Sequence, residues 1–342
     1  MRITMLAGGV GGAKFAKGVR ALLRSPQFQR DHPDSALTIV TNVGDDMWLS
    51  GLKVCPDLDS IMYALADVND TTRGWGRQDE SERVSAEMGA YGVGWPWFTL
   101  GDLDLGTHIA RTGLLRDGLT LSAVTAQLCS RWELGARLLP SSDDDVETWV
   151  ELEPGYDEPE AVHFEEWWVR LRARVPARRF IQRGVDSAQP GAGVVEAIAD
   201  ADVVILAPSN PVVSLGTILG YPGVGGRAGV PGIPGVAEAV RETPAPVVGV
   251  SPIIESNPLR GMARQCLEAL GQECSAEAVG LAYGSRRSGG LLDGWLVDDA
   301  DAAALPSLRQ TGLSARSAPL WMTDAETSRQ LAADTLDFAA HC

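Results

Sequence analysis

The residues near the amino terminus that are best suited to chemistry are four glycines, Gly8, Gly9, Gly11 and Gly12, followed by Lys14. They stand between a short apolar run and a helix-forming segment, which is the pattern of a strand, a tight turn and a helix. Such a turn brings backbone N–H groups close to a phosphate, and the helix N-terminus adds partial positive charge. We therefore predict a phosphate-binding turn; the alternative is a turn that only packs the helix closely on the strand.

Neither standard glycine motif fits this turn. The dinucleotide motif G-x-G-x-x-G needs a third glycine where Lys14 stands. The P-loop motif needs Ser or Thr directly after its lysine, where the chain has Phe15. The residues of this turn therefore argue against a nicotinamide-dinucleotide site and against P-loop hydrolysis.

Acidic residues follow the next strand-like run, residues 37–41. Asp45 and Asp46 come shortly after it, and Asp57 and Asp59 open a helical segment. Ligands of open α/β sheets bind beyond the carboxyl ends of the strands, and carboxylates there suit Mg²⁺, which prefers oxygen ligands. We predict that at least one of Asp45, Asp46 and Asp59 binds a metal; the alternative is that they are solvated turn acids. Asp57 could be a helix N-cap.

Polar side chains also follow two later strand-like runs. Ser209 and Asn210 come after residues 201–207, and Ser251 comes after residues 246–250. Each of these side chains can bind a nucleotide or cap the next helix, and the sequence leaves both readings open.

His108 and the tryptophans are weaker candidates. His108 lies inside a helical segment, where a lone histidine is more often structural than functional. Eight of the ten Trp residues lie between Trp48 and Trp168. Most of them are expected in the core, although such a set could also line a pocket for a flat ring.

These candidates need a scaffold, and the order of segments predicts one. Strand-like and helical segments alternate at both ends of the chain, which favours an α/β class with a Rossmann-like, doubly wound, mainly parallel sheet. We predict a nucleotide- and phosphate-binding core made of residues 1–70 and 175–342. Residues 71–174 are rich in Trp and helix-like, and we expect a mostly helical insertion that shapes an acceptor pocket.

Composition limits the function classes. The net charge of -16, from 29 basic and 45 acidic residues, argues against a nucleic-acid surface. A phosphate site in such a chain must therefore be positive locally. Five cysteines without a C-x-x-C pair and only four His make zinc an unexpected ligand. No apolar run reaches the roughly 20 residues of a membrane helix, and no secretory leader is evident, so we expect a cytoplasmic protein.

Several segments together resemble, in the same order, the CofD/FbiA family, the 2-phospho-L-lactate or phosphoenolpyruvate transferases of coenzyme F420 biosynthesis. The resemblance extends from the first strand to Leu291-Leu292-Asp293-Gly294-Trp295-Leu296, and Arg73-Gly74-Trp75-Gly76 and Gly135-Ala136-Arg137-Leu138-Leu139-Pro140 are typical of the actinobacterial FbiA branch. The main segments are Gly8-Gly9-Val10-Gly11-Gly12-Ala13-Lys14, Asn42-Val43-Gly44-Asp45-Asp46, Pro56-Asp57-Leu58-Asp59, residues 97–111, Ala207-Pro208-Ser209-Asn210-Pro211 and Ser251-Pro252-Ile253-Ile254.

The resemblance implies two small-molecule substrates, no nucleic-acid or membrane partner, and a homodimer. The acceptor would be the deazaflavin Fo, and the donor a three-carbon acid linked to guanosine diphosphate. Transfer would form dehydro-F420-0 or F420-0 and release GMP. Mg²⁺ would be the cofactor, and actinobacterial relatives favour phosphoenolpyruvate by analogy.

The resemblance also assigns residues. Asp45 and Asp59 would bind the metal, with Asp46 third, and Asp45 or Asp46 would take the hydroxyl proton. Trp48, His108 and Ser142 would lie towards Fo. The predicted phosphate and nucleotide residues are Gly8, Gly9, Gly11, Gly12, Lys14, Ser209, Asn210, Ser251 and Arg260.

One departure and one alternative remain. Relatives commonly carry Gly and often Lys after the Ser-Pro-Ile-Ile segment, whereas this chain has Glu255-Ser256-Asn257, which adds negative charge near the presumed diphosphate. The alternative function is a CofD-like nucleotide-binding protein without Fo transferase activity, regulatory or directed at another ligand. It would retain the glycine turn but would not need the set of aspartates.

Overall fold

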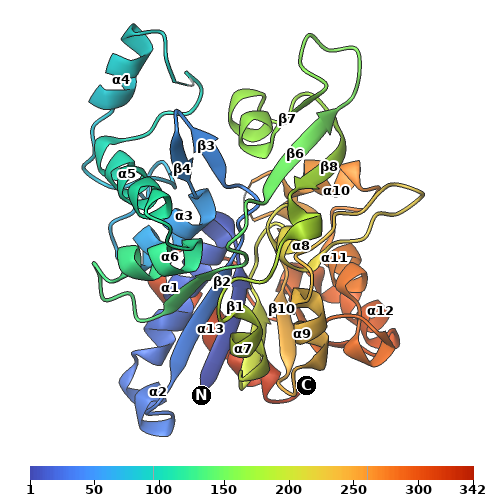
Figure 1. Cartoon of the computed structure of the whole chain (residues 1–342). Coiled ribbons are helices and arrows are strands. Elements are labelled where there is room, and N and C mark those ends of the chain that lie inside the picture. The colour runs from blue at the N-terminus through green and yellow to red at the C-terminus, as the bar shows by residue number, and fades with distance from the viewer. Residues whose placement is uncertain (95, 260) are drawn as a thin grey trace.

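A seven-stranded parallel sheet forms the centre of the protein (Figure 1). The computed structural model describes residues 1–94, 96–259 and 261–342. The strand order β14-β13-β10-β9-β1-β2-β5 is that of a doubly wound fold, in which the chain leaves β1 toward one edge and returns at β9 toward the other. The strands are β1 (Arg2–Ala7), β2 (Ala36–Thr41), β5 (Arg137–Pro140), β9 (Val203–Leu206), β10 (Val247–Val250), β13 (Gly294–Val297) and β14 (Ser314–Ser317).

The central strands are apolar because both of their faces are covered. Every residue of β9 and β10 is buried, as are Ile3 to Ala7 of β1. Strands that lose water on both faces are continuous runs of Val, Ile and Leu rather than alternating patterns. The Rossmann-like class predicted from the sequence is confirmed.

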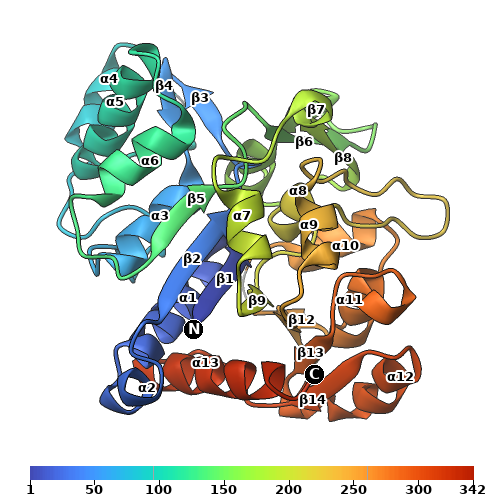
Figure 2. The same ribbon diagram turned by 60° about the horizontal axis from the view of Figure 1, so that its bottom comes forward.

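Helices cover the two faces of the sheet (Figures 1 and 2). On one face α1 packs against α3 and α13, and on the other α7 packs against α9 and α11 against α12. The α-helices are α1 (Gly9–Leu23), α2 (Pro26–Asp31), α3 (Pro56–Leu65), α4 (Arg83–Ala90), α5 (Asp102–Arg116), α6 (Leu121–Cys129), α7 (Val194–Ala199), α8 (Leu215–Leu219), α9 (Val236–Glu242), α10 (Ala263–Ala269), α11 (Ala276–Tyr283), α12 (Leu305–Gln310) and α13 (Ala325–Ala339).

Beyond the carboxyl ends of the strands the chain adds two groups of elements (Figure 1). One group holds the hairpin β3–β4 with α4, α5 and α6. The other is an antiparallel sheet of order β7-β6-β8. The short strands are β3 (Met47–Leu49), β4 (Leu52–Val54), β6 (Glu147–Leu152), β7 (Ala161–His163), β8 (Ala177–Arg183), β11 (Ile253–Ile254) and β12 (Asn257–Pro258).

The structure corrects the predicted character of residues 71–174. The helices α4, α5 and α6 lie in that segment, but after Cys129 the chain forms β5, which enters the central sheet as the edge strand beside β2, and β6 and β7, which belong to the antiparallel sheet. The expectation of a mostly helical insertion was therefore wrong for residues 137–163. The physical reason is that Leu138 and Leu139 are apolar enough to be buried at the sheet edge, and both are 4 % exposed.

The first turn of α1 depends on glycine because another loop lies against it. A Cβ atom at Gly11 would lie 2.6 Å from the carbonyl oxygen of Pro208, in the loop after β9. A backbone atom cannot yield as the end of a flexible side chain can. The glycine turn and the β9 loop therefore meet at the point where the strand order reverses.

Replacing Gly11 with Ala is expected to lower the free energy of unfolding by about 1–3 kcal/mol, because the added methyl group overpacks this contact. Gly113→Ala is the matched control, since a Cβ there meets nothing within 4 Å in the exposed part of α5. That change should be neutral or stabilise by up to about 1 kcal/mol, because Ala is the better helix former. Urea unfolding of the two variants checks the difference, and equal stabilities would contradict the close approach.

Two further observations concern the whole described chain. None of its helices is long and apolar enough to cross a membrane. All five cysteines are free thiols.

Candidate functional site

The predicted phosphate turn meets the β9 loop through one serine. Ser209 Oγ accepts a hydrogen bond from the Gly8 N–H at 3.0 Å and donates to the Gly8 carbonyl at 2.7 Å. The structure thus brings Gly8 and Ser209 together, but Ser209 positions the turn, and the N–H of Gly8 is already in use. Binding of a phosphate would rely on the remaining N–H groups of the first turn of α1.

A carboxylate also lies at this turn. Asp57 Oδ2 accepts a hydrogen bond from Asn42 Nδ2 at 2.9 Å, and the backbone N–H of Gly9 donates to Asp57 as well. Asn42 Oδ1 in turn accepts from the Gly44 N–H at 2.8 Å, so Asn42 connects the β2 loop to α3. A negative group at the N-terminus of α1 is what the helix dipole favours. Asp57 is therefore part of the site and is not the N-cap of its own helix, since Cys55 occupies that position.

Asp45, Asp57 and Glu165 form a buried acidic cluster beside the glycine turn. Burial raises the pKa of Asp45 well above its usual value, and the negative charges of Asp57 and Glu165 raise it further. Burial likewise raises the pKa of Asp57 to about 6, and burial together with Asp57 raises the pKa of Glu165 to about 8. Each group is only 4 % exposed. The cluster thus favours neutralisation, by protons or by a cation.

Glu165 is the site residue that sequence reasoning missed. It follows β7, outside the loops of the central sheet, and reaches the cluster because the antiparallel sheet stands over the carboxyl edge. His163 fixes this arrangement: its Nδ1 accepts from the Glu165 N–H at 3.2 Å, which leaves Nε2 to donate to the Asp46 carbonyl at 3.2 Å. Burial lowers the pKa of His163 to about 4, so the ring is neutral at physiological pH.

Asp46 has a different environment from Asp45. The ammonium group of Lys53 lies 3.8 Å from Asp46 Oδ2 and also pairs with Asp145. Burial raises the pKa of Asp46 to about 7, although Lys53 opposes this shift. Of the site carboxyl groups with a raised pKa, Asp46 is the one that also lies close to a buried ammonium group.

Asp59 is engaged in a buried polar network of α3 and α5. Arg111 donates from both terminal nitrogens to the two carboxylate oxygens of Asp59, and its Nη1 also lies 3.1 Å from His108 Nδ1. His108 Nε2 lies 3.3 Å from Asp104 Oδ1, which accepts a hydrogen bond from the Tyr63 hydroxyl at 2.7 Å. Burial raises the pKa of Asp59, and Arg111 opposes that rise.

This network contains the only grouping in the described chain in which three or more His, Cys, Asp or Glu residues place ligand atoms within 4.8 Å, namely Asp59, Asp104 and His108. Arg111 and Tyr63 already bind its two carboxylates. The metal role predicted for Asp59 thus stays a prediction, and the carboxylates that the structure places near Asp45 are Asp57, Glu165 and Asp46.

Most of the other predicted residues have structural partners. Asn210 Oδ1 accepts from the N–H groups of Val212 and Val213, so it caps the following turn. Ser251 Oγ bonds to the backbone of Ile253. Ser142 Oγ donates to the Gln189 carbonyl at 2.6 Å and is fully buried.

Two of the predicted residues have no such hydrogen bond among the described residues, and a third is not described. Trp48 lies on β3 and is 41 % exposed, and the Lys53 ammonium lies 5.8 Å from its ring centroid. Lys14 is exposed in α1. Arg260 lies outside the described residues.

Several buried oxygen atoms near the strand ends have no partner in the described part of the chain and are of the kind that a hard divalent cation binds. Asp45 Oδ1 and the hydroxyl oxygens of Thr41 and Ser141 are buried and have no hydrogen-bond partner among the described residues. Unpartnered buried oxygen atoms are costly unless a ligand or an ion completes them. Carboxylate and hydroxyl oxygens are the ligands that Mg²⁺ accepts, usually with several waters and substrate phosphates.

Replacing Glu165 with Gln tests the acidic cluster. Below about pH 4.5 the carboxyl group is protonated in both folded and unfolded chains. Between there and about pH 8, only the folded chain retains its proton, so native stability falls as the pH rises through this window. Without divalent cations, Glu165→Gln should therefore raise the free energy of unfolding at pH 8 by about 1–3 kcal/mol and have little effect at pH 4.

The same variant should reduce the stabilisation that Mg²⁺ brings at pH 8, since one charge of the cluster is lost. Glu160→Gln, at an exposed position outside the cluster, is the matched control and should change neither quantity. Denaturant unfolding at both pH values, with and without Mg²⁺, measures them. A pH-independent effect of Glu165→Gln would show that Glu165 does not titrate within the cluster.

The fold has solved counterparts. Two crystal structures of protein BH3568 from Bacillus halodurans, one of them described as a member of the upf0052 family, superpose with TM-scores of 0.59 and 0.60 at 16% and 17% identity. They cover 98% of this chain and 99% and 98% of their own chains. At this identity the similarity concerns the fold alone.

Sequence comparison is more specific. A relative named phosphoenolpyruvate transferase from Mycobacterium sp. (strain KMS) is 50% identical over 336 residues, covering 97% of this chain and 96% of the relative. The protein of that name from Streptomyces coelicolor is 48% identical, covering 99% of this chain and 98% of its own. The family model described as 2-phospho-L-lactate transferase CofD matches residues 3–337. The chain therefore belongs to the CofD family of 2-phospho-L-lactate transferases.

Proposed function

We propose that this chain transfers a phosphoenolpyruvyl group, or a 2-phospho-L-lactyl group, from a guanosine-diphospho-linked donor to the terminal hydroxyl of Fo in coenzyme F420 biosynthesis. The products would be dehydro-F420-0, or F420-0, and GMP. The observation that carries the proposal is a family match from residue 3 to residue 337. The buried acidic cluster around Asp45 supports it. Relatives named phosphoenolpyruvate transferase, at about half identity, favour phosphoenolpyruvate as the transferred group.

The reaction exchanges one phosphorus–oxygen bond for another. The terminal hydroxyl oxygen of Fo attacks the phosphorus that bears the three-carbon acid. The bond from that phosphorus to the bridging oxygen breaks, and the electron pair leaves with GMP. The hydroxyl proton passes to a base, so the enzyme would be a transferase of substituted phosphate groups.

Asp46 is the best-suited proton acceptor in the site. Its pKa of about 7, raised by burial, lies near physiological pH, where a general base is most effective. The Lys53 ammonium lies 3.8 Å from this carboxylate and favours its charged form. Asp45, with its pKa raised further by neighbouring acids, is the second candidate from the sequence.

Mg²⁺ would supply charge neutralisation at the diphosphate oxygens when bound. Asp45 would hold it, and Asp57 and Glu165 are the nearest further carboxylates; Asp59, predicted from the sequence, would first have to leave Arg111. The unpartnered Asp45 oxygen supports this assignment.

The donor would lie along the reversal point of the sheet. The first turn of α1 would offer backbone N–H groups to the diphosphate. Ser209 positions that turn through its two hydrogen bonds to Gly8. Asn210 and Ser251 would shape the guanosine site through the turns that they stabilise. Lys14 and Arg260 remain predicted sources of positive charge.

Fo would approach from the side of the β3–β4 hairpin. Trp48 is exposed there and can stack on a flat ring. His108 and Ser142 are buried, so their predicted role toward Fo would be to position other residues, His108 through Arg111 and Ser142 through the loop after β5. A homodimer and a cytoplasmic location are part of the same proposal.

The identity of the transferred acid is tested by kinetics with three donors. Guanosine-diphospho-linked phosphoenolpyruvate, 2-phospho-L-lactate and 3-phosphoglycerate are each supplied with Fo and Mg²⁺, and kcat/KM is compared. We expect phosphoenolpyruvate to give the highest value. Binding of the donors without turnover of any of them would favour the alternative of a nucleotide-binding protein without transferase activity.

A further inference from the structure

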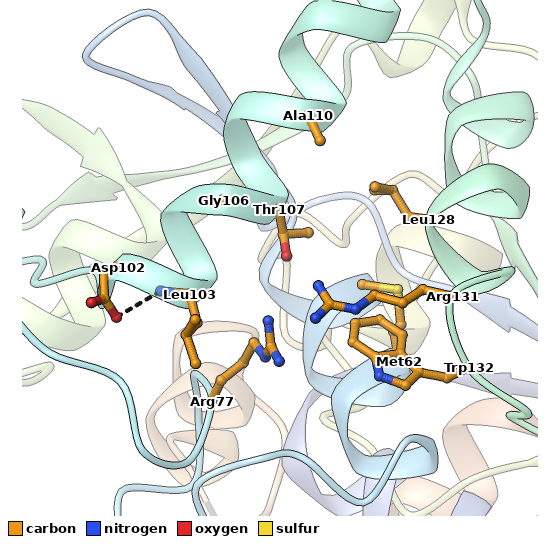
Figure 3. Close-up of a pocket in the computed structure, with 10 residues that line it drawn as sticks. All are labelled: Met62, Arg77, Asp102, Leu103, Gly106, Thr107, Ala110, Leu128, Arg131 and Trp132. Atoms are coloured by element: carbon orange, nitrogen blue, oxygen red, sulfur yellow. Dashed lines mark hydrogen bonds between the residues drawn. The ribbon is translucent and has the colours of Figure 1, made fainter.

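A pocket lies among the helices α3, α5 and α6, apart from the loops that form the acidic site (Figure 3). Its volume is about 260 Å³. Met62 and Trp132 line one side, and Thr107 contributes a hydroxyl group from α5. The guanidinium groups of Arg77 and Arg131 point into the space between them.

These two arginines have no acidic partner. Neither has an Asp or Glu oxygen within 4.0 Å among residues 1–94, 96–259 and 261–342. Arg77 is only 8 % exposed, and its Nε has no hydrogen-bond partner. A buried unpaired cation is costly, and two facing cations add mutual repulsion.

Aromatic rings hold the two guanidinium groups in place. The central carbon of the Arg131 guanidinium lies 4.8 Å from the Trp132 ring centroid, and that of Arg77 lies 5.5 Å from the same ring. Arg77 also lies 5.8 Å from the Tyr63 ring. Stacking of this kind orients the N–H donors of arginine without using them.

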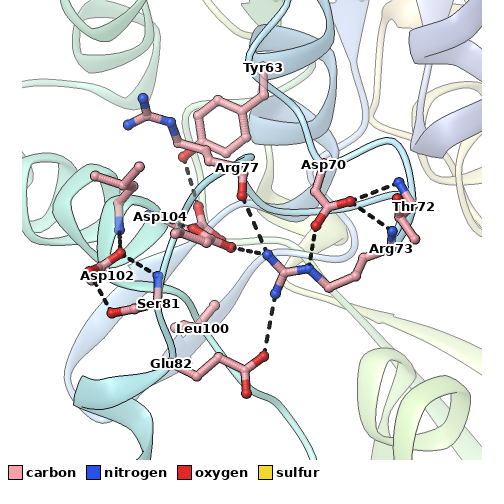
Figure 4. Close-up of polar contacts among 12 residues, drawn as sticks. Tyr63, Asp70, Thr72, Arg73, Arg77, Ser81, Glu82, Leu100, Asp102 and Asp104 are labelled. Atoms are coloured by element: carbon pink, nitrogen blue, oxygen red, sulfur yellow. Dashed lines mark hydrogen bonds and ion pairs between the residues drawn. The ribbon is translucent and has the colours of Figure 1, made fainter.

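A neighbouring arginine shows the contrast (Figure 4). Arg73 pairs with Asp70 at 2.8 Å and with Glu80 at 2.8 Å. Asp102, the acidic residue at the pocket, instead accepts hydrogen bonds from the Ser81 backbone and hydroxyl, and these bonds lower its pKa. What sets Arg77 apart is that it is buried as well as unpaired among the described residues, and that Arg131 faces it across the same pocket.

We propose that this pocket binds the tetrahedral dianion of a small phosphate compound, with Arg77 and Arg131 as paired donors. Guanidinium groups match the geometry of phosphate oxygens and form charge-assisted hydrogen bonds with them. Drug-sized ligands fill pockets of about 300–1,000 Å³, so this smaller pocket suits inorganic phosphate or a short phosphate monoester. The binding does not depend on the proposed transferase activity.

The test follows the indole N–H signal of Trp132 in NMR spectra of ¹⁵N-labelled protein, identified by its loss in Trp132→Phe. Inorganic phosphate and phosphoenolpyruvate are titrated separately, with chloride at equal ionic strength as the reference. We expect at least one phosphate compound to move the signal saturably. Arg131→Gln, at an exposed position, and Arg77→Gln should each weaken that binding by about tenfold or more.

Arg30→Gln, an exposed arginine on α2 that is outside the pocket, is the matched control and should leave the affinity unchanged. A response to phosphate alone identifies the free ion as sufficient, and a response to phosphoenolpyruvate alone identifies the ester as the ligand. No movement with either compound, equal movement with chloride, or an unchanged affinity in Arg131→Gln would overturn the proposal. Because the test follows binding near Trp132 and not transfer to Fo, failure here leaves the transferase proposal untouched.

Discussion

Replacing Asp45 with Asn is expected to lower the rate of transfer to Fo by roughly 10³-fold or more, without loss of the fold. Electrostatic stabilisation at the reacting phosphate is the largest single contribution in such reactions, and removal of one group commonly costs 10²–10³ in kcat. Asp45 is buried, has an unpartnered oxygen and lies among carboxylates that raise its pKa. Steady-state assay of product formation measures the effect.

Stability and binding separate this effect from misfolding. Removal of a buried repulsive carboxylate should leave the variant at least as stable as the parent at pH 8 without divalent cations. Binding of Fo, followed by its fluorescence, should be largely retained. Asp34→Asn, at an exposed position, is the matched control and should retain full activity. Unchanged turnover in Asp45→Asn would remove Asp45 from the proposed metal site.

Replacing Arg111 with Met is expected to give the largest loss of stability, about 3–5 kcal/mol, because it leaves the buried carboxylate of Asp59 without its cation. Burial already raises the pKa of Asp59 despite Arg111, so loss of the guanidinium should raise it further. The penalty should therefore grow as the pH rises above about 4, where Asp59 of the unfolded chain ionises. Denaturant unfolding across this pH range measures it.

The double variant Asp59→Asn, Arg111→Met is the control for this prediction. It removes both charges, so it should be more stable than Arg111→Met alone. A loss below about 1 kcal/mol in the single variant would show that the pair contributes as little as an exposed ion pair. An equally large loss in the double variant would assign the effect to packing of the long arginine side chain.

Much of the site could be predicted because parallel strands end at one edge of their sheet. The sequence places Gly8, Asp45, Ser209 and Ser251 shortly after apolar runs, and these runs are β1, β2, β9 and β10. The turn after β1 meets the loop after β9 because the sheet is parallel and its order reverses between these two strands. Predicting that these residues lie at one edge of the sheet requires no knowledge of side-chain contacts.

The features of the site that the sequence does not predict depend on contacts between distant segments of the chain. Glu165 reaches Asp45 only because β6 to β8 fold over the sheet edge, and the local sequence around it gives no strand-end signal. The spacing of Asp57 and Asp59 places both residues in the first turn of α3. It does not indicate which of them faces Asp45. That choice is made by Asn42, which binds Asp57, and by Arg111, which binds Asp59.

The measurement that tests the central claim most directly is simultaneous detection of both products of one reaction. The protein is incubated with Fo, Mg²⁺ and guanosine-diphospho-linked phosphoenolpyruvate, and dehydro-F420-0 and GMP are quantified by mass spectrometry. The proposed transfer predicts equal amounts of the two products, and neither without Fo. Release of GMP without Fo, or no product with this donor or its 2-phospho-L-lactyl counterpart, would contradict the assignment of this chain as an Fo transferase.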